Sequence, residues 1–224
     1  ITFFIAAVAG GSGSMARAGL ATILQAKNPP DSWQGHAGQE LIGTYVQAGQ
    51  IEPLNFLYEK NGWLDVMPKT LIPLISQDDK IYSVPVNIHR ANVLWYNPAV
   101  LARYQVAPPQ TLEDWFAGMD VMRAAGMDAP LALGEQWTAV HLFETILLAC
   151  LGADAYDGLW TGATDWNSPQ VTQALETYAR LLQYTNRDAP SLSWQDAAQL
   201  VSNGDAAYNV MGDWEEGFFK ELNK

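Results

Sequence analysis

The chain of 224 residues contains one cysteine and few basic residues. A single thiol can form neither an internal disulfide nor a cysteine-based metal site. Because Cys150 lies in the apolar run 146–151, we expect it to be a small buried side chain. Twelve Lys and Arg against 24 Asp and Glu give a net charge of −12. This balance argues against binding to nucleic-acid phosphates or to anionic lipid.

Long apolar runs are also missing. Residues 1–10 are apolar but too short to span a bilayer, and no basic residues precede them as in a signal peptide. We expect this segment to be a strand that leads into the glycine-rich turn 10–14. We expect the chain to begin in the middle of a fold and to stop, at Lys224, inside a predicted helix. We therefore expect a fragment of a longer fold.

Catalytic and metal-binding motifs are absent as well. The three histidines form no HxH or HExxH pattern, and there is no nucleophile elbow or complete phosphate-binding loop. We therefore expect neither a metal nor a cofactor, and no enzyme. One alternative stays open, because a pair of acids such as Glu135 and Asp213 could serve glycoside hydrolysis. Asp213 also has a simpler interpretation, as the cap of a final helix in a box with Glu216.

Apolar residues make up 49% of the chain and charged residues 16%, which is enough apolar surface for a substantial core. Helical and strand patterns alternate, which predicts an α/β fold with largely parallel pairing. Two apolar stripes are expected on helices, Val140-Phe143-Leu147-Cys150 and Val171-Leu175-Tyr178-Leu182. The proline-rich segment 106–110 is the expected crossing between two lobes, 1–107 and 108–224, each incomplete.

Residues 81–98 carry the clearest functional signal. An apolar strand breaks at Pro85, a polar turn containing His89 follows, and a second strand, 93–96, runs into an Asn-Pro helix start. His36 stands in a similar polar turn. A neutral imidazole can donate to or accept from a hydroxyl, so contact with a polar small molecule and a structural role remain equally open for both. His141 lies among apolar neighbours and is expected to be structural.

Nine tryptophans are present, and several stand at the ends of predicted elements. Trp137, Trp194 and Trp214 are of this kind. A flat indole face matches the patch of axial C–H groups on a pyranose ring, which would favour sugar binding. The alternative is that each ring simply covers the end of the core.

Several motifs together resemble the carbohydrate-specific substrate-binding proteins of ABC importers, the extracellular solute-binding group that includes maltose-binding proteins. The resemblance is greatest to glucose/galactose-binding members. The motifs are NPPDSWQGHAGQE (28–40), SVPVNIHRANVLWYN (83–97), APLALGEQWT (129–138), LSWQ (192–195) and AYNVMGDW (207–214).

The resemblance implies a partial type II periplasmic-binding-protein fold, α/β with two lobes that close over a sugar. It implies that Gln34, His36 and His89 contact hydroxyl groups from the first lobe, and that Trp194 and Trp214 supply aromatic contacts from the second. Asn87, Trp137 and Asp213 are implied as further lining or support.

By the same resemblance, the protein is expected to be a monomer outside the cytoplasmic membrane, periplasmic or extracellular, either free or lipid-anchored. It would pass a glucose- or galactose-like monosaccharide to membrane permease subunits. Two alternatives remain, namely a carbohydrate-active hydrolase with a Trp-rich cleft and a sugar sensor that does not transport.

Overall fold

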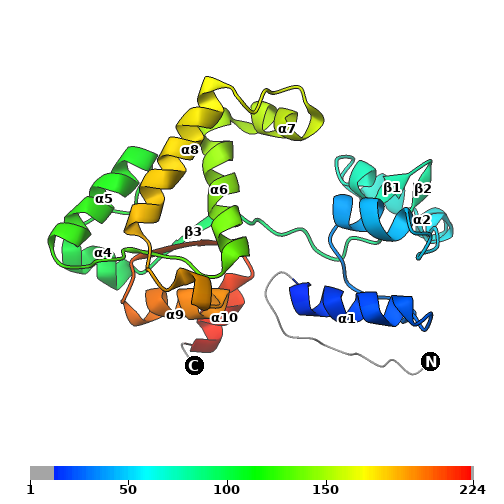
Figure 1. The fold of residues 1–224 in the computed structure, drawn as a ribbon, viewed down its shortest axis with the longest axis horizontal. Helices are drawn as coiled ribbons and strands as arrows, with labels where there is room; N and C mark the ends of the chain where they lie inside the picture. The colour runs from blue at the N-terminus through cyan, green and yellow to red at the C-terminus, as the bar shows by residue number, and fades with distance from the viewer. Residues whose placement is uncertain (1–12, 223–224) are drawn as a thin grey trace. The chain divides into compact units, whose positions relative to one another are not determined.

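The computed structural model describes residues 13–222, so the strand predicted in residues 1–10 lies outside the described part. The chain forms two compact units, unit 1 up to Ile88 and unit 2 from His89 onward (Figure 1). The sequence predicted a boundary between residues 107 and 108 instead. The difference arises because strand β3 (Val93–Tyr96) pairs within unit 2, and Val100 and Leu101 of the next helix pack into the core of unit 2.

Unit 1 consists of short helices and one hairpin. Its described elements are α1 (Ser14–Gln25), a π-helix (Leu41–Val46), α2 (Asn55–Asn61), α3 (Trp63–Val66), a 3-10 helix (Ile72–Ile75), β1 (Ser76–Gln77) and β2 (Lys80–Ile81). Asp78 and Asp79 connect the antiparallel strands β1 and β2 with φ values of 51° and 60°. Positive φ at both positions is what a type I′ hairpin turn requires. The small core centres on Tyr58, Ile75 and Ile81.

Unit 2 contains a three-stranded sheet between helices. Its elements are β3, α4 (Pro98–Tyr104), α5 (Leu112–Ala124), β4 (Leu131–Ala132), α6 (Gln136–Leu151), α7 (Ala153–Thr161), α8 (Pro169–Leu181), two 3-10 turns (Leu182–Tyr184 and Ala189–Ser191), α9 (Trp194–Asn203), β5 (Tyr208–Met211) and α10 (Glu215–Leu222). The strand order is β3-β5-β4. β5 runs parallel to β4 but antiparallel to β3, and β1 and β2 are also antiparallel. The prediction of largely parallel pairing was therefore wrong.

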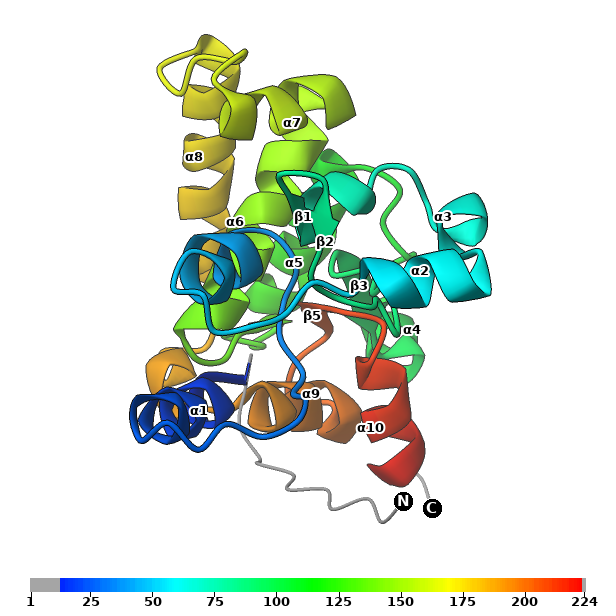
Figure 2. The same ribbon diagram turned by 90° about the vertical axis from the view of Figure 1, so that its right-hand side faces the viewer.

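The central strand β5 separates two apolar layers. Tyr208 and Val210 point to the layer formed with α5, α6 and α8, whereas Ala132 of β4 packs on the other side with α9. This alternation follows from the two-residue period of a strand. Figures 1 and 2 show the sheet with α6 and α8 on one side and α9 and α10 on the other.

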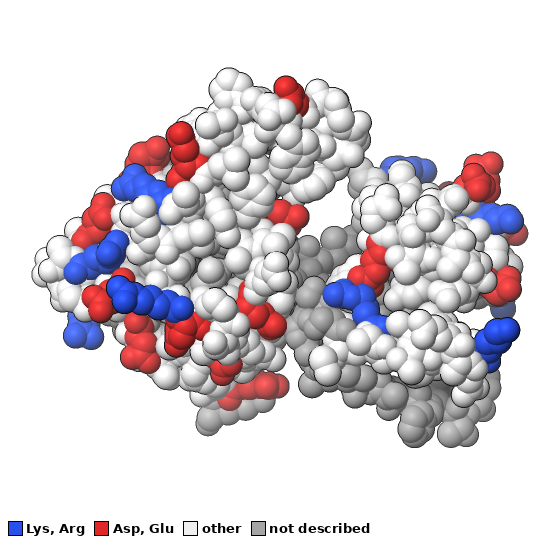
Figure 3. Space-filling model, viewed as in Figure 1, with Lys and Arg blue, Asp and Glu red and all other residues white. Residues whose placement is uncertain are grey.

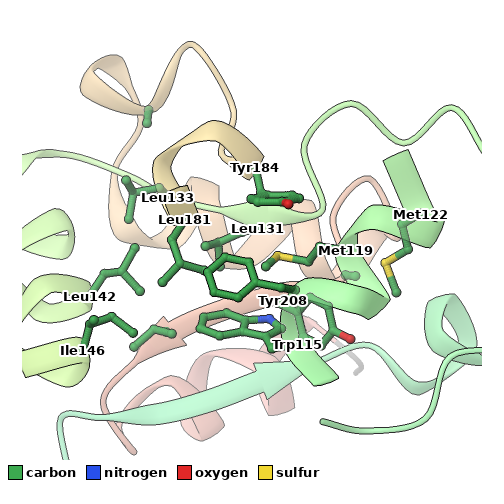
Figure 4. Packing of buried hydrophobic residues seen from close by; sticks show 14 of the residues in the cluster. Trp115, Met119, Met122, Leu131, Leu133, Leu142, Ile146, Leu181, Tyr184 and Tyr208 are labelled. Atoms are coloured by element: carbon green, nitrogen blue, oxygen red, sulfur yellow. The ribbon is translucent and has the colours of Figure 1, made fainter. Parts of the chain in front are cut away.

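The larger layer is the main hydrophobic core of the described residues (Figure 4). Tyr208 lies in its middle, fully buried, with its ring 6.0 Å from that of Trp115 in an edge-on contact. Burial raises the pKa of the Tyr208 hydroxyl to about 12. The core thus holds β5 along its length, and the turn after β5 starts from a rigid strand.

Helix caps agree with the sequence, but the predicted apolar stripes do so only in part. The Asn97 side chain caps α4 at the Asn-Pro start noted in the sequence. Thr111 and Ser193, each three residues before an Asp, form capping boxes at the starts of α5 and α9. On α6, however, the buried residues are Thr138, Leu142, Ile146 and Leu147, and Val140 is exposed. On α8 they are Val171, Ala174 and Leu181, and Leu175 is exposed. α6 is apolar on most of its surface, so its sequence does not single out one face.

Among the described helices, none by itself has the length and apolar character to cross a membrane. α6 and α7 reach that composition only when taken together, and they are bent by 117° at Gly152.

Glu215, at the start of α10, is fully buried, and neither of its carboxyl oxygens has a hydrogen-bond partner among the described residues. Burial raises the pKa of this carboxyl to about 8, since an unpaired charge is poorly solvated there. Between pH 4.5 and 8 the folded chain keeps this proton while the unfolded chain releases it. The free energy of unfolding therefore falls as the pH rises through this window.

We predict that Glu215→Gln removes this decline. The variant should resemble the wild type near pH 4.5 and exceed it near pH 8 by a few kcal/mol, on the order set by the pKa difference. Urea unfolding at both pH values, followed by tryptophan fluorescence, measures the difference. The matched control is Glu216→Gln, because Glu216 is the exposed neighbour. Equal effects of the two substitutions would show that the Glu215 carboxyl is not the titrating group.

Candidate functional site

The candidate site begins where the segment before β3 meets the turn after β5. The ladder between these strands ends at the pair Val93 and Met211. Beyond it, the Asp213 N–H donates to the Arg90 carbonyl (2.9 Å), and the Arg90 N–H donates to Asp213 Oδ2 (3.2 Å). Asp213 thus extends the strand pairing with one backbone and one side-chain bond, and it holds residues 89 and 90 in place.

The second carboxylate oxygen of Asp213 lies 2.7 Å from Nδ1 of His89. Hydrogen bonds from the Arg90 backbone and from His89 keep the pKa of Asp213 below its usual value. An ionised carboxylate only accepts, so Nδ1 of His89 must carry the proton in this contact. In the tautomer with its one proton on Nδ1, the ring has Nε2 as an acceptor for a ligand hydroxyl.

The predicted capping box of Asp213 and Glu216 was therefore wrong. Only the backbone carbonyl of Asp213 contacts Glu216, and the carboxylate faces His89 and Arg90.

The indole ring of Trp214 packs edge-on against the imidazole of His89. Its centroid lies 5.1 Å from that of His89, with the two planes at 87°. The six-membered part of the indole lies directly over Gly212, where a Cβ atom would overlap with it. Gly212 is therefore the residue that lets Trp214 fold back over the turn and reach His89.

His141 and Trp137 continue the aromatic contacts on α6. The His141 ring lies 5.8 Å from Trp214 and 5.1 Å from Trp137. Burial lowers the pKa of His141, so its imidazole is neutral near pH 7. Nδ1 of His141 and Nε1 of Trp137 are buried without a hydrogen-bond partner among the described residues. We name Trp137, His141, Trp214, His89 and Asp213 the aromatic cluster of unit 2.

Trp194 takes a different position. It packs edge-on against Phe218 of α10, at 5.5 Å between centroids. Its described contact thus fits the packing alternative, in which an indole covers the end of the core. Its predicted role as a sugar contact stays a prediction.

The remaining predicted residues lie in unit 1. Nδ1 of His36 lies 2.9 Å from Oε2 of Glu40, and the His36 N–H donates to Oε1 of the same carboxylate. Arg17 also donates to Oε2 of Glu40, at 2.9 Å. His36 is thus oriented in the same way as His89, by a carboxylate on Nδ1. Gln34 and Asn87 have exposed side chains.

Three contacts were missed at the sequence level, namely those of His36 with Glu40, of Trp137 with His141 and of His89 with Asp213. Glu40 follows His36 by four residues, and His141 follows Trp137 by four, so helical spacing was an available signal for each. The pairing of His89 with Asp213 joins positions 124 residues apart and had no local signal.

No three His, Cys, Asp or Glu side chains lie close enough to hold a metal ion within residues 13–222.

Comparison with known proteins identifies the family. The family model of bacterial extracellular solute-binding proteins matches residues 5–221. The chain belongs to this family.

Its relatives are transport-associated binding proteins. An uncharacterized ABC transporter extracellular-binding protein of Pyrococcus horikoshii is 34% identical over 95% of this chain and 48% of its own length. A probable sugar-binding periplasmic protein of Mesorhizobium japonicum is 32% identical over 97% of this chain and 52% of its own. The chain thus spans about half the length of the curated relatives that it matches.

Solved structures agree on the fold. A structure from work on xylan utilization by the thermophilic bacterium Caldanaerobius polysaccharolyticus superposes with a TM-score of 0.81. It is 21% identical and covers 92% of this chain and 53% of that one. The periplasmic-binding-protein fold expected from the sequence is thereby confirmed.

We predict that Gly212→Ala displaces the Trp214 indole, because the added methyl group would occupy the position of the ring. The free energy of unfolding should fall by about 1–3 kcal/mol, as for other overpacked sites. The near-ultraviolet circular dichroism should change, since the contact between Trp214 and His89 is lost.

Gly217→Ala provides the control, because a Cβ on this helical residue meets no atom within 4 Å. That substitution should keep the spectrum and stabilise α10 slightly. If Gly212→Ala keeps both the wild-type spectrum and stability, the close packing of Trp214 on residue 212 is wrong.

Proposed function

We propose that the full-length protein is the sugar-binding subunit of an ABC importer. It captures a glucose- or galactose-like monosaccharide between two lobes and delivers it to membrane permease subunits. The observation that carries this proposal is the His89 imidazole, oriented by Asp213 and adjoining the indole of Trp214.

This arrangement suits a hexose in two ways. The Nε2 atom of neutral His89 can accept a hydroxyl hydrogen bond, and the indole of Trp214 offers an apolar face for the C–H patch of the ring. A hydroxyl left without a partner in a buried site costs about 1–3 kcal/mol, so fixed acceptors discriminate between epimers. His36, held by Glu40, supplies a second oriented imidazole from unit 1. In the proposal Gln34, Asn87, Trp137 and Trp194 add further contacts.

The names of related proteins support a sugar and leave its identity open. A relative 25% identical is the glucose-binding protein GlcS of Saccharolobus solfataricus, and one 29% identical is the xylose/arabinose-binding protein XacG of Haloferax volcanii. The bacterial solute receptor AcbH, 25% identical with a TM-score of 0.62, is described by its preference for β-D-galactopyranose. The ligand class that we propose is a pyranose sugar whose hydroxyl groups donate to the fixed acceptors of the site.

The proposal places the protein in the periplasm or outside the cell, free or lipid-anchored, as a monomer that binds and does not catalyse. The hydrolase alternative took Asp213, together with Glu135, as an example of a candidate catalytic pair. The Asp213 carboxylate instead contacts His89 and the Arg90 backbone, a positioning role that favours the binding protein.

Titration calorimetry of the full-length protein against glucose, galactose, xylose and maltose tests the proposal. We expect heat with at least one of these sugars. His89→Ala should then weaken binding by about 1–3 kcal/mol, the cost of an unmet hydroxyl. It should change the unfolding free energy little, because the His89 side chain is 42% exposed.

Two results would contradict the proposal. No heat with any saccharide would remove the sugar-binding function. A His89→Ala variant that loses stability but binds sugar as tightly as the wild type would assign His89 a structural role.

A further inference from the structure

Glu215 closes the turn that carries two residues of the aromatic cluster. Its N–H donates to the Gly212 carbonyl at 3.1 Å, which is the bond between the first and fourth residues of a β-turn. Asp213 and Trp214 are the two central residues of this turn. Both contact His89, one through its carboxylate and the other through its ring. A movement of Glu215 would therefore displace both side chains that contact the imidazole.

The side chain of Glu215 is buried on the face of α10 that packs on the sheet. Glu215 and Phe219 are four residues apart, so they share one face of the helix. Phe219 packs into the apolar layer formed with α9, and its ring lies 5.5 Å from that of Trp95. Nε1 of Trp95 also donates to the Gly212 carbonyl, at 3.4 Å. The turn is thus attached to this layer at both of its ends.

The Glu215 carboxyl is unpaired in these surroundings. The residue is fully buried, and neither oxygen has a hydrogen-bond partner within residues 13–222. A neutral carboxylic acid can remain in such a place, whereas an unsolvated carboxylate is much more costly. Burial alone raises the pKa of this group to about 8. Loss of the proton therefore favours a conformation in which the side chain reaches water.

The charges around Glu215 do not compensate for its burial. Figure 3 shows acidic side chains at the surface over α9 and α10. Lys220 of α10 is paired with Glu216, at 2.7 Å. The titratable side chains on α9, α10, β3, β5 and the turn are Tyr96, Asp196, Tyr208, Asp213, Glu216, Lys220 and Glu221. Since burial is the one cause of the raised pKa, none of them sets it.

We propose that Glu215 is a pH-sensitive switch for the turn that holds Asp213 and Trp214. With its proton, the side chain stays buried and the turn keeps His89 oriented. Without the proton, the side chain moves to water and the turn opens. The inference rests on the proposed function and adds a regulation of the same site, in which sugar binding weakens as the pH rises.

The sign follows from the proton that each conformation holds. Between pH 4.5 and 8 the closed turn keeps the proton of Glu215, whereas an open turn with a solvated carboxyl releases it. Each step upward in pH within this window therefore favours the open turn. The global unfolding described above shares this sign, but the switch acts within the folded protein.

The full-length protein without ligand tests the switch itself. Near-ultraviolet circular dichroism of the wild type should change between pH 6 and 8.5, while the far-ultraviolet spectrum stays constant. Glu215→Gln cannot ionise and should keep its pH 6 spectrum. Glu215→Met is a second neutral variant, in case a buried amide disturbs folding. The matched control is Glu216→Gln at the exposed neighbour, which should behave as the wild type does.

Titration calorimetry at pH 6 and 8.5 tests the effect on binding. The ligand is whichever of glucose, galactose, xylose and maltose binds the full-length protein most tightly. The Kd of the wild type and of Glu216→Gln should rise by about threefold or more at the higher pH. Glu215→Gln and Glu215→Met should keep their pH 6 affinity. The histidines are common to all these proteins, so the comparison isolates Glu215.

The outcomes separate the switch from the sugar-binding function. A wild-type Kd that is equal at both pH values, or one that rises equally in the neutral variants, would overturn the switch and keep the function. No binding of any of these sugars would remove the function. The ligand-free spectra would then still decide the switch, because a wild-type spectrum that is constant from pH 6 to 8.5 overturns it.

Discussion

The Asp213 carboxylate is the constraint on which the candidate site depends. It accepts from the imidazole of His89 and from the backbone of Arg90, and so it fixes the segment before β3 against the turn after β5. It can do so only because β5 is held in the core by Tyr208 and Val210 on one face. Apolar packing therefore sets the position of a polar site, and the site inherits the rigidity of the strand.

Local sequence signals predicted local structure well. Asn97, Thr111 and Ser193 cap helices where the sequence indicated, because each cap depends on residues two to four positions away. The failures involve distant partners. The boundary expected at residue 107 ignored the pairing of β3 with β5, and the capping role expected for Asp213 ignored His89. Neither partner can be inferred from spacing along the chain.

The tryptophans illustrate the same limit. Trp194 and Trp214 have equivalent positions at the ends of elements, and the sequence left sugar contact and core packing open for both. In the structure Trp214 contacts His89 and His141, whereas Trp194 contacts Phe218. What distinguishes them is the glycine at position 212, which allows the indole to fold back. Gly212 was visible in the sequence, but its role could be recognised only once the orientation of the Trp214 ring was known.

The central place of β5 also has a consequence for biosynthesis. His89 and Asp213 are 124 positions apart, and at translation rates of about 5–20 residues per second the second follows the first by roughly 6–25 s. During this delay β3 has emerged without its neighbour, and its unpaired edge could join another chain. A ribosome halted before Tyr208 would display α5, α6 and α8 without the strand that they cover. Unit 2 can therefore complete its three-stranded sheet only after β5 has been synthesised.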